Sequence, residues 1–497
     1  MELKKYKLSD VATIHNGATP SSMHLEYFHG DIVWLTPKDL SDQQSKYIYR
    51  GERNITQEAY NSCSTHLLPQ GTILMSSRAP IGLLAIAGCS CCTNQGFKSL
   101  VVNNVNCDTE YLYYYLKHNI SRIIGLGSGT TFQEVSKKSL ETFEIELPIK
   151  IEQVRISKIL ADIDRKIALN REINRNLEAM ARQLYDYWFV QFDFPDEKGK
   201  PYKSSGGKMV WNEKLKREIP VKWRAVSVND ISVSQRGVSF DKSDISENGI
   251  QVLRGNNIED NHYVSDSNIV IIPENLVSPE QHIKKYDIIM TMSSGSKEHV
   301  GKCMQFQLDS VHTFGAFLNR FRPTEHPHYL FLFLSSAYFK LKVKSLCNGT
   351  GINNLTYQNF NDIILPLGDS ILMRKFDAVV FDLFDRIGIN DKEIDQLIQQ
   401  RDELLPLLMN GQVSVMPTEV NCDLVFISLM KSIVYNHCLS FLLHMSSCIR
   451  NCLNLLRKKH YKESFGNFEV IFGCFRQVLA VETERFLLSQ LAESPQK

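Results

Sequence analysis

The chain has 497 residues, of which 43% are hydrophobic and 22% charged. That composition supplies enough apolar material for two or three folded domains and excludes a disordered chain. The 56 basic and 55 acidic side chains give a net charge of +1, so the overall balance gives no sign of nucleic acid. If the protein binds DNA, its basic groups must be gathered on one face.

The first residues carry several lysines and no apolar run, so we expect no signal peptide. No stretch of about 18 uncharged apolar residues predicts a membrane span. Of the twelve cysteines, Cys89, Cys91 and Cys92 form one cluster, but no second cluster stands at zinc-finger spacing. We therefore expect reduced, mostly buried thiols, no metal site and a cytoplasmic protein.

The chain repeats itself with a period of about 220 residues, which is too long for a solenoid and indicates two copies of one domain-plus-helix unit. The matched segments keep their order and a nearly constant offset. They are 32–35 with 250–253, 72–75 with 287–290, 111–116 with 329–334, 129–130 with 349–350, and 146–148 with 364–366.

Within each copy, short β-branched and aromatic runs alternate with Gly, Pro and Asn clusters, which is typical of strands and turns. Strands are predicted at Asp31–Leu35, Thr72–Met75 and Leu100–Val102, and helices at Thr109–Asn119 and Pro327–Leu346. Each copy is therefore predicted to be an α/β domain, and the fold class of the chain is α+β.

Each domain continues into a long helix whose apolar positions alternate in steps of four and three, the seam of a coiled coil. The first seam is Ile156, Leu160, Ile163, Ile167, Asn170, Asn174, Leu177, Ala181, Leu184 and Trp188. The second is Phe376, Val380, Leu383, Ile387, Asn390, Ile394, Leu397, Arg401, Leu404 and Leu408.

Because the two seams match, we expect the helices to pack on each other as an antiparallel coiled coil. Pairing about their midpoints would place Asn174 opposite Asn390 and Asn170 opposite Ile394. At 1.5 Å per residue, about 37 residues form a rod of about 55 Å, long enough to hold two domains apart. One alternative is two unrelated amphipathic surface helices. Another is that the asparagines face water.

These features predict six segments. They are a first domain at 1–150, a spacer helix at 151–190, a connector at 191–222, a second domain at 223–368, a second spacer helix at 369–411, and a helical tail of unknown role at 412–497. The connector is polar and rich in turn residues, and the tail lies outside the repeat.

The sequence lacks the motifs of the enzymes that act on DNA. We find no Asn/Asp-Pro-Pro-Tyr/Phe loop of an adenine methyltransferase and no Gly-x-x-x-x-Gly-Lys-Ser/Thr loop of a motor. Pro195–Lys198 is only faintly similar to a nuclease motif. We therefore predict a binding protein with no catalytic residue.

Several motifs of the first copy resemble the target recognition domain of type I restriction-modification specificity subunits. They are Gly17–Ser21, Trp34–Leu40, Gly71–Gly82, Asn94–Lys98 and Gly127–Phe132. The helix onset Glu152-Gln153 and the ending Leu407–Gly411 are similar to that family's conserved spacers. The resemblance covers roughly residues 1–413.

This resemblance implies a non-catalytic subunit that directs a complex to a two-part target in double-stranded DNA. It implies two methylation subunits and two motor-nuclease subunits as partners, and no membrane. No cofactor is expected in this chain; S-adenosylmethionine, ATP and Mg would belong to the partners. The second domain departs from the first at Arg254–Ile258 and Ser293–Lys297, which implies a different half-site.

Specific DNA binding uses Arg, Lys, Asn and Gln at base edges and Ser and Thr on phosphates. The predicted DNA contacts of the first domain are Lys38, Ser76, Ser77, Arg78, Asn94, Gln95, Lys98, Thr130, Thr131, Gln133 and Lys137. Those of the second are Arg254, Asn256, Asn257, Ser293, Ser294, Lys297, Asn348, Thr350, Asn353 and Asn354.

Simpler explanations exist for some of these motifs. Pro37–Asp39 could be only a turn, Gly127–Thr130 only a connecting loop, and the tyrosines at 111 and 113–115 helix packing rather than a stacking platform for bases. For the whole chain, the alternatives are a stand-alone repeat DNA-binding protein and a protein-interaction scaffold without a methyltransferase partner.

Overall fold

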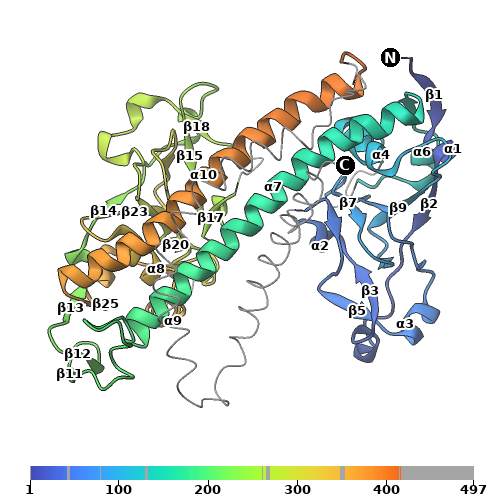
Figure 1. Cartoon of the computed structure of the whole chain (residues 1–497). Helices are drawn as coiled ribbons and strands as arrows, with labels where there is room; N and C mark the ends of the chain where they lie inside the picture. Colours follow the sequence, from blue (N-terminus) through green and yellow to red (C-terminus); the bar gives the residue numbers. More distant parts are fainter. Residues whose placement is uncertain are drawn as a thin grey trace, which may run out of the picture. The chain divides into compact units, whose positions relative to one another are not determined.

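The computed structural model describes residues 2–41, 45–78, 80–128, 133–259, 261–264, 269–347, 353–413 and 415. These residues belong to the first of the chain's two units, Met1–Val415 (Figure 1). The predicted helical tail lies outside the described residues, apart from residues 412, 413 and 415.

The first domain contains two sheets and one flanking strand pair. Its five-stranded sheet has the order β2 (Ala12–Asn16), β9 (Phe97–Val102), β6 (Ile73–Ser76), β7 (Leu84–Ala87) and β4 (Tyr47–Ile48). The other sheet places β3 (Ile32–Leu35) between β5 (Arg53–Ile55) and β8 (Cys92–Thr93), with β8 parallel to β3. β1 (Lys4–Lys7) pairs with β10 (Glu144–Leu147) directly before the long helix.

The second domain repeats most of this topology, with four strands in its larger sheet. Its sheet has the order β14 (Ser232–Arg236), β23 (Leu318–Pro323), β19 (Ile288–Thr291) and β21 (Cys303–Gln305). β15 (Ile250–Leu253) lies between β18 (Ile271–Ile272) and a parallel β22 (Thr313–Phe314), and β13 (Arg224–Ser227) pairs with β25 (Ile364–Leu367). The pairs β16 (Ile258–Glu259) with β17 (His262–Tyr263), and β20 (Ser293–Ser294) with β24 (Asn353–Asn354), complete it. The internal repeat of the sequence is thus a repeat of structure.

The helices fall between and after the strands. In the first domain they are α1 (Leu8–Val11), α2 (Pro37–Ser41), α3 (Gln57–Ser62), α4 (Thr109–His118), α5 (Ile120–Ile124) and α6 (Lys137–Glu141), with a 3-10 turn at Leu25–Phe28. The second domain has α8 (Pro327–Leu334) and α9 (Ala337–Leu346), and 3-10 turns at 228–230, 242–244, 255–257, 274–276, 279–281 and 357–361. The tyrosines of α4 are buried, so they pack the helix and offer no stacking platform.

The single helix predicted over Pro327–Leu346 is wrong in detail, because the chain breaks at Ser335 and Ser336. The Ser336 hydroxyl accepts a hydrogen bond from the Phe339 amide at 3.2 Å and so begins α9 as a separate helix. Serine at this position satisfies an amide that has no partner within the new helix.

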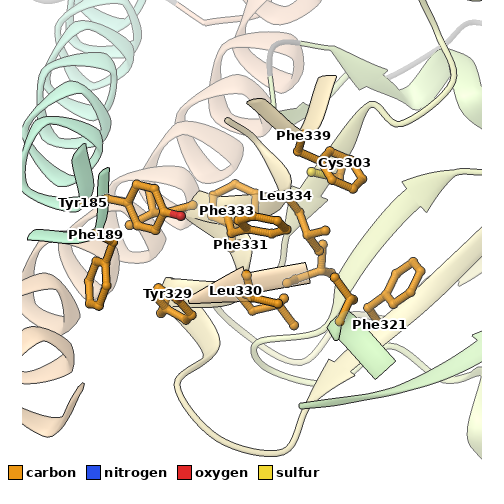
Figure 2. Close-up of a cluster of buried hydrophobic side chains, with 14 of the residues drawn as sticks. Tyr185, Phe189, Cys303, Phe321, Tyr329, Leu330, Phe331, Phe333, Leu334 and Phe339 are labelled. Atoms are coloured by element: carbon orange, nitrogen blue, oxygen red, sulfur yellow. The ribbon is translucent and has the colours of Figure 1, made fainter. Parts of the chain in front are cut away.

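The connector is more ordered than its polar sequence indicates. It contains the hairpin β11 (Met209–Asn212) and β12 (Arg217–Pro220), and its Phe192 and Phe194 rings pack on Trp223 at 5.2 and 5.3 Å. The apolar core continues from there into the second domain. Figure 2 shows Tyr185 and Phe189 beside Tyr329, with ring centroids 5.7 and 4.6 Å from that tyrosine.

Two long helices run side by side, α7 (Lys150–Tyr185, continued by a π-helical turn Asp186–Val190) and α10 (Ser370–Met409) (Figure 1). Their contacts are antiparallel, because residue numbers fall along α10 as they rise along α7. Asp164 meets Arg401 at 3.0 Å, Asn170 donates to Glu393 at 2.8 Å, and Asn174 accepts from Asn390 at 2.7 Å.

The seam asparagines are buried between the helices. The prediction that Asn174 faces Asn390 is confirmed, and Asn174 also donates to Asp391 at 2.7 Å. Asn170 pairs with Glu393, the neighbour of its expected partner Ile394. Their side chains are at most 6% exposed, so the alternative in which they face water is wrong. Such buried polar pairs fix the register of two helices at some cost in stability.

Each end of the helix pair belongs to the core of one domain. The start of α7 and the end of α10 (Leu405, Leu408 and Met409) pack into the core of the first domain. The end of α7 and the start of α10 pack into the core of the second. The helix pair therefore holds both domains, and each domain contacts both helices. None of the helices described is long and apolar enough to cross a membrane.

Candidate nucleic-acid interface

In the first domain, four segments that are distant in sequence meet at one end of the sheets. The backbone N–H of Asn94 donates to the carbonyl oxygen of Leu35 at 3.0 Å, and that of Ser77 donates to the carbonyl oxygen of Gly96 at 2.7 Å. Ser77 in turn accepts from the Val135 amide at 3.0 Å, and Arg78 forms a β-bridge with Glu134. We call the segments 36–39, 76–78, 94–98 and 133–137 the first loop cluster.

The second domain builds the same cluster with the same backbone hydrogen bonds. The Gly315 amide donates to Leu253 at 2.9 Å, and the Met292 amide donates to Phe317 at 2.9 Å. Met292 accepts from the Leu355 amide at 2.8 Å, and β20 pairs with β24. We call the segments 254–257, 292–297, 315–318 and 353–355 the second loop cluster.

A side-chain cap shapes the first segment of each cluster. In the first, the Thr36 amide donates to the Asp39 carboxylate at 2.7 Å, and in the second the Arg254 amide donates to the Asn257 amide oxygen at 2.8 Å. Both caps span three residues, so they form the same turn from different residue types. The capping interaction expected at Pro37–Asp39 is therefore present and leaves the Lys38 side chain exposed, so a DNA contact by Lys38 stays a prediction.

Two matched glycines allow a neighbouring chain to approach each cluster closely. A Cβ on Gly17 would lie 2.0 Å from the Asn94 oxygen, and one on Gly237 would lie 2.2 Å from the Gly315 oxygen. Backbone oxygens cannot move aside as the end of a flexible side chain can. Glycine is therefore required at both positions.

We expect Gly17→Ala and Gly237→Ala each to lower the free energy of unfolding by about 1–3 kcal/mol, because the added methyl overpacks a rigid contact. Urea unfolding of the full chain measures this loss. Hydrogen exchange should rise at 93–96 for the first variant and at 314–317 for the second. Gly295→Ala is the control, since a Cβ there meets nothing within 4 Å. Equal behaviour of all three variants would contradict the close approach.

The structure gathers most of the predicted DNA contacts in the two clusters. Exposed side chains are those of Lys38, Gln95, Gln133, Asn256, Lys297 and Asn354, and partly exposed ones are those of Arg78, Asn94, Lys137, Arg254, Ser293 and Ser294. Several of these already have partners within the protein. Lys38 contacts Glu52 at 3.0 Å, and Gln95 accepts from Thr19.

Four predicted contacts are buried and serve the fold instead. The Ser76 hydroxyl donates to Pro80 at 2.6 Å, and that of Ser77 donates to Gly96 at 3.1 Å. Lys98 is 6% exposed and contacts Glu134 at 3.0 Å, while Asn257 is 3% exposed and donates to Val264 at 3.0 Å. Their burial argues against direct DNA contact, and these side chains hold the loops that carry the exposed residues.

The remaining predicted contacts lie outside the described residues. These are Thr130, Thr131, Asn348 and Thr350, together with the side chain of Asn353, whose backbone belongs to β24.

The pKa values of one histidine and two cysteines near the first loop cluster are shifted in the direction that favours their neutral forms. Burial, followed by the nearby His66 and Lys137, lowers the pKa of His15. Burial also raises the pKa of Cys91 to about 12 and that of Cys92 to about 11. The seven cysteines in the part of the chain that the structure describes are free thiols, and no group of metal-ligating side chains occurs there.

Sequence analysis missed Phe317, a 65% exposed aromatic side chain inside the second loop cluster. The predicted DNA contacts are all polar residues, so an apolar side chain is not among them. The sequence signal for Phe317 is a mismatch between the copies, because the residue of the first copy that accepts the same hydrogen bond is Gly96.

Two repeated domains with solvent-facing polar loops, held by a pair of antiparallel helices, define a two-site recognition protein. A model of the family described as type I restriction modification DNA specificity domain matches residues 1–179 and 220–399. The chain therefore belongs to the type I restriction-modification specificity family, as the sequence resemblance predicts, and is a specificity subunit with two recognition domains.

The chain is similar to individual specificity subunits and to one solved structure. The chain is 30% identical over 423 residues to the type I restriction enzyme MjaIX specificity subunit of Methanocaldococcus jannaschii, covering 82% of this chain and 93% of that one. It is 30% identical over 172 residues to the EcoKI specificity subunit of Escherichia coli, covering 33% and 37%. A crystal structure of the S subunit from M. genitalium aligns with a TM-score of 0.48 and 18% identity, covering 82% and 96%.

Proposed function

We propose that this chain directs a type I restriction-modification complex to a bipartite DNA target, each domain binding one half. One observation carries this proposal: the same backbone hydrogen bonds frame both loop clusters, while the side chains mounted on them differ. A shared frame gives both domains the same way of approaching DNA. Different side chains give them different base preferences.

The differences fall where bases would be contacted. Lys38 in the first cluster corresponds to Asn256 in the second, and Arg78 corresponds to Ser293. Arginine and lysine favour guanine edges and asparagine favours adenine, so the two half-sites would differ in sequence. The exposed lysines and serines would also contact phosphates.

The helix pair offers matched surfaces for partners. Exposed apolar residues recur on α7 and its π-helical continuation at intervals of 18 residues, which is five helical turns and therefore one face. Each has an exposed apolar counterpart on α10. The pairs are Ile151 with Ile371, Leu169 with Ile389, and Tyr187 with Leu407. Residues 18 apart are about 27 Å apart along a helix, so these pairs mark equivalent positions on the two helices and not a continuous apolar patch.

Equivalent positions on α7 and α10 suit two copies of one partner, which we propose to be the methylation subunit. Two motor-nuclease subunits would join the full complex. S-adenosylmethionine, ATP and Mg would be bound by these partners, which would also supply catalysis. Such a complex would work in the cytoplasm, on double-stranded DNA.

A salt titration of DNA binding tests the proposal. The chain assembled with its methylation subunit should lose affinity by about 10³- to 10⁵-fold between 50 and 200 mM salt, if it neutralises about six to ten phosphates. It should also prefer the genomic target over a scrambled duplex. An affinity that does not change with salt would contradict direct phosphate contact.

A further inference from the structure

Phe317 lies on a turn that is held rigidly from three sides. Its carbonyl oxygen accepts from the amides of Met292 at 2.9 Å and Ser293 at 3.3 Å. The Leu318 amide closes the turn by donating to Gly315 at 2.8 Å, and the Arg236 guanidinium donates to Ala316 at 3.2 Å. The backbone is fixed while the aromatic side chain is 65% exposed.

The corresponding turn of the first domain has no room for such a side chain. Gly96 fills the position of Phe317, because its oxygen accepts from the Ser77 amide as that of Phe317 accepts from Met292. A Cβ on Gly96 would lie 2.9 Å from Pro37. In the second domain Gly255 replaces Pro37, and a Cβ there would meet only Thr291 at 3.5 Å.

The two domains therefore differ in residue size at two matched positions. In the first, Pro37 lies 2.9 Å from where a Cβ on Gly96 would stand, and in the second the corresponding positions are Gly255 and Phe317. The second domain therefore lacks the proline that crowds Gly96 in the first, and its Phe317 side chain is 65% exposed. An exposed aromatic side chain on a rigid turn is poorly explained by packing within the chain.

We propose that Phe317 is a specificity-determining residue, which makes an apolar contact with a base in the half-site bound by the second domain. The inference rests on the proposed function and extends it to one side chain. Phenylalanine can pack on the thymine methyl group or insert beside a base, and neither contact needs a charge. A preorganised turn limits the entropy lost when the ring is buried against DNA.

The test uses the full chain assembled with its methylation subunit, a duplex carrying the target mapped in the genome, and a duplex with the second half-site scrambled. Phe317→Ala should bind the target about 10- to 100-fold more weakly, the loss that follows from exposing a buried phenylalanine. Binding to the scrambled duplex should not change. Phe317→Leu, which keeps an apolar side chain, should retain most of the affinity.

Two further measurements and a control variant test the base contact specifically. The salt dependence of Phe317→Ala should equal that of the wild type, because no phosphate contact is removed. Single base-pair changes should show a lost preference at one position of the second half-site and none in the first. Val311→Ala, an 83% exposed apolar residue outside the loop cluster, should have no effect.

The outcomes separate the two hypotheses. If the wild-type complex does not distinguish target from scrambled DNA, the proposed function fails and the role of Phe317 fails with it. If the wild type does distinguish them, but Phe317→Ala binds equally well or loses affinity for both duplexes alike, only the role of Phe317 is overturned.

Discussion

A chain lengthened by one heptad in each long helix should modify a target with a longer gap and the same two half-sites. The insertions follow Ile167 in α7 and Leu397 in α10, between the Asp164–Arg401 contact and the Asn174–Asn390 contact. Seven residues add about 10 Å, and a heptad keeps the faces of both helices nearly aligned. At 3.4 Å per base pair, the gap should grow by up to about three base pairs.

Methylation mapping in cells that carry the lengthened chain measures the gap directly. A chain with the heptad in α7 alone is the control. Its helices can keep either the Asp164–Arg401 contact or the Asn174–Asn390 contact but not both, so it should melt at a lower temperature. Altered bases in either half-site, with an unchanged gap, would show that the helices do not set the spacing.

Arg401→Ala should destabilise the helix pair strongly, by about 3–5 kcal/mol. Arg401 of α10 contacts Asp164 of α7 at 3.0 Å, and both side chains are less than one-fifth exposed. Asp164 also accepts from the Tyr114 hydroxyl of α4 at 2.5 Å. The substitution leaves the carboxylate largely buried without its cation, where three elements meet.

Urea unfolding of the full chain would measure this loss. The double variant Asp164→Asn with Arg401→Met removes both members of the pair and should be more stable than Arg401→Ala, since the buried carboxylate is no longer left without Arg401. Lys216→Ala breaks an ion pair with Glu213 whose members are 74% and 76% exposed, and should have little effect. A loss no larger than that of Lys216→Ala would contradict the buried role of Arg401.

The repeat and the helix pair could be predicted because they depend on periodicity. The spacing of Asn170, Asn174 and Asn390 within two apolar seams was enough to place Asn174 opposite Asn390. The predicted strands at 31–35 and 72–75 also correspond to β3 and β6 within one residue at each end. Patterns of this kind are local and survive folding. The domain boundaries stay predictions.

The site was harder to predict because residue type does not show which way a loop side chain points. Ser77 and Lys98 are common DNA-contacting types, yet both turn inward, where they contact each other at 3.3 Å. The connector shows the opposite error, because its polar sequence predicts an exposed loop, yet its Phe192 is fully buried. Contacts between residues distant in sequence determine which way these side chains point, and such contacts leave no periodic pattern in a single sequence.

Sequencing of DNA methylation, in cells with and without this chain, tests the central claim most directly. With the chain and its methylation partner present, we expect one two-part motif to be methylated throughout the genome, and deletion of the chain should remove that methylation. Exchange of residues 223–368 for those of another specificity subunit should change one half of the motif and leave the other intact. A methylation pattern that does not depend on the chain, or a motif that changes in both halves, would contradict the account.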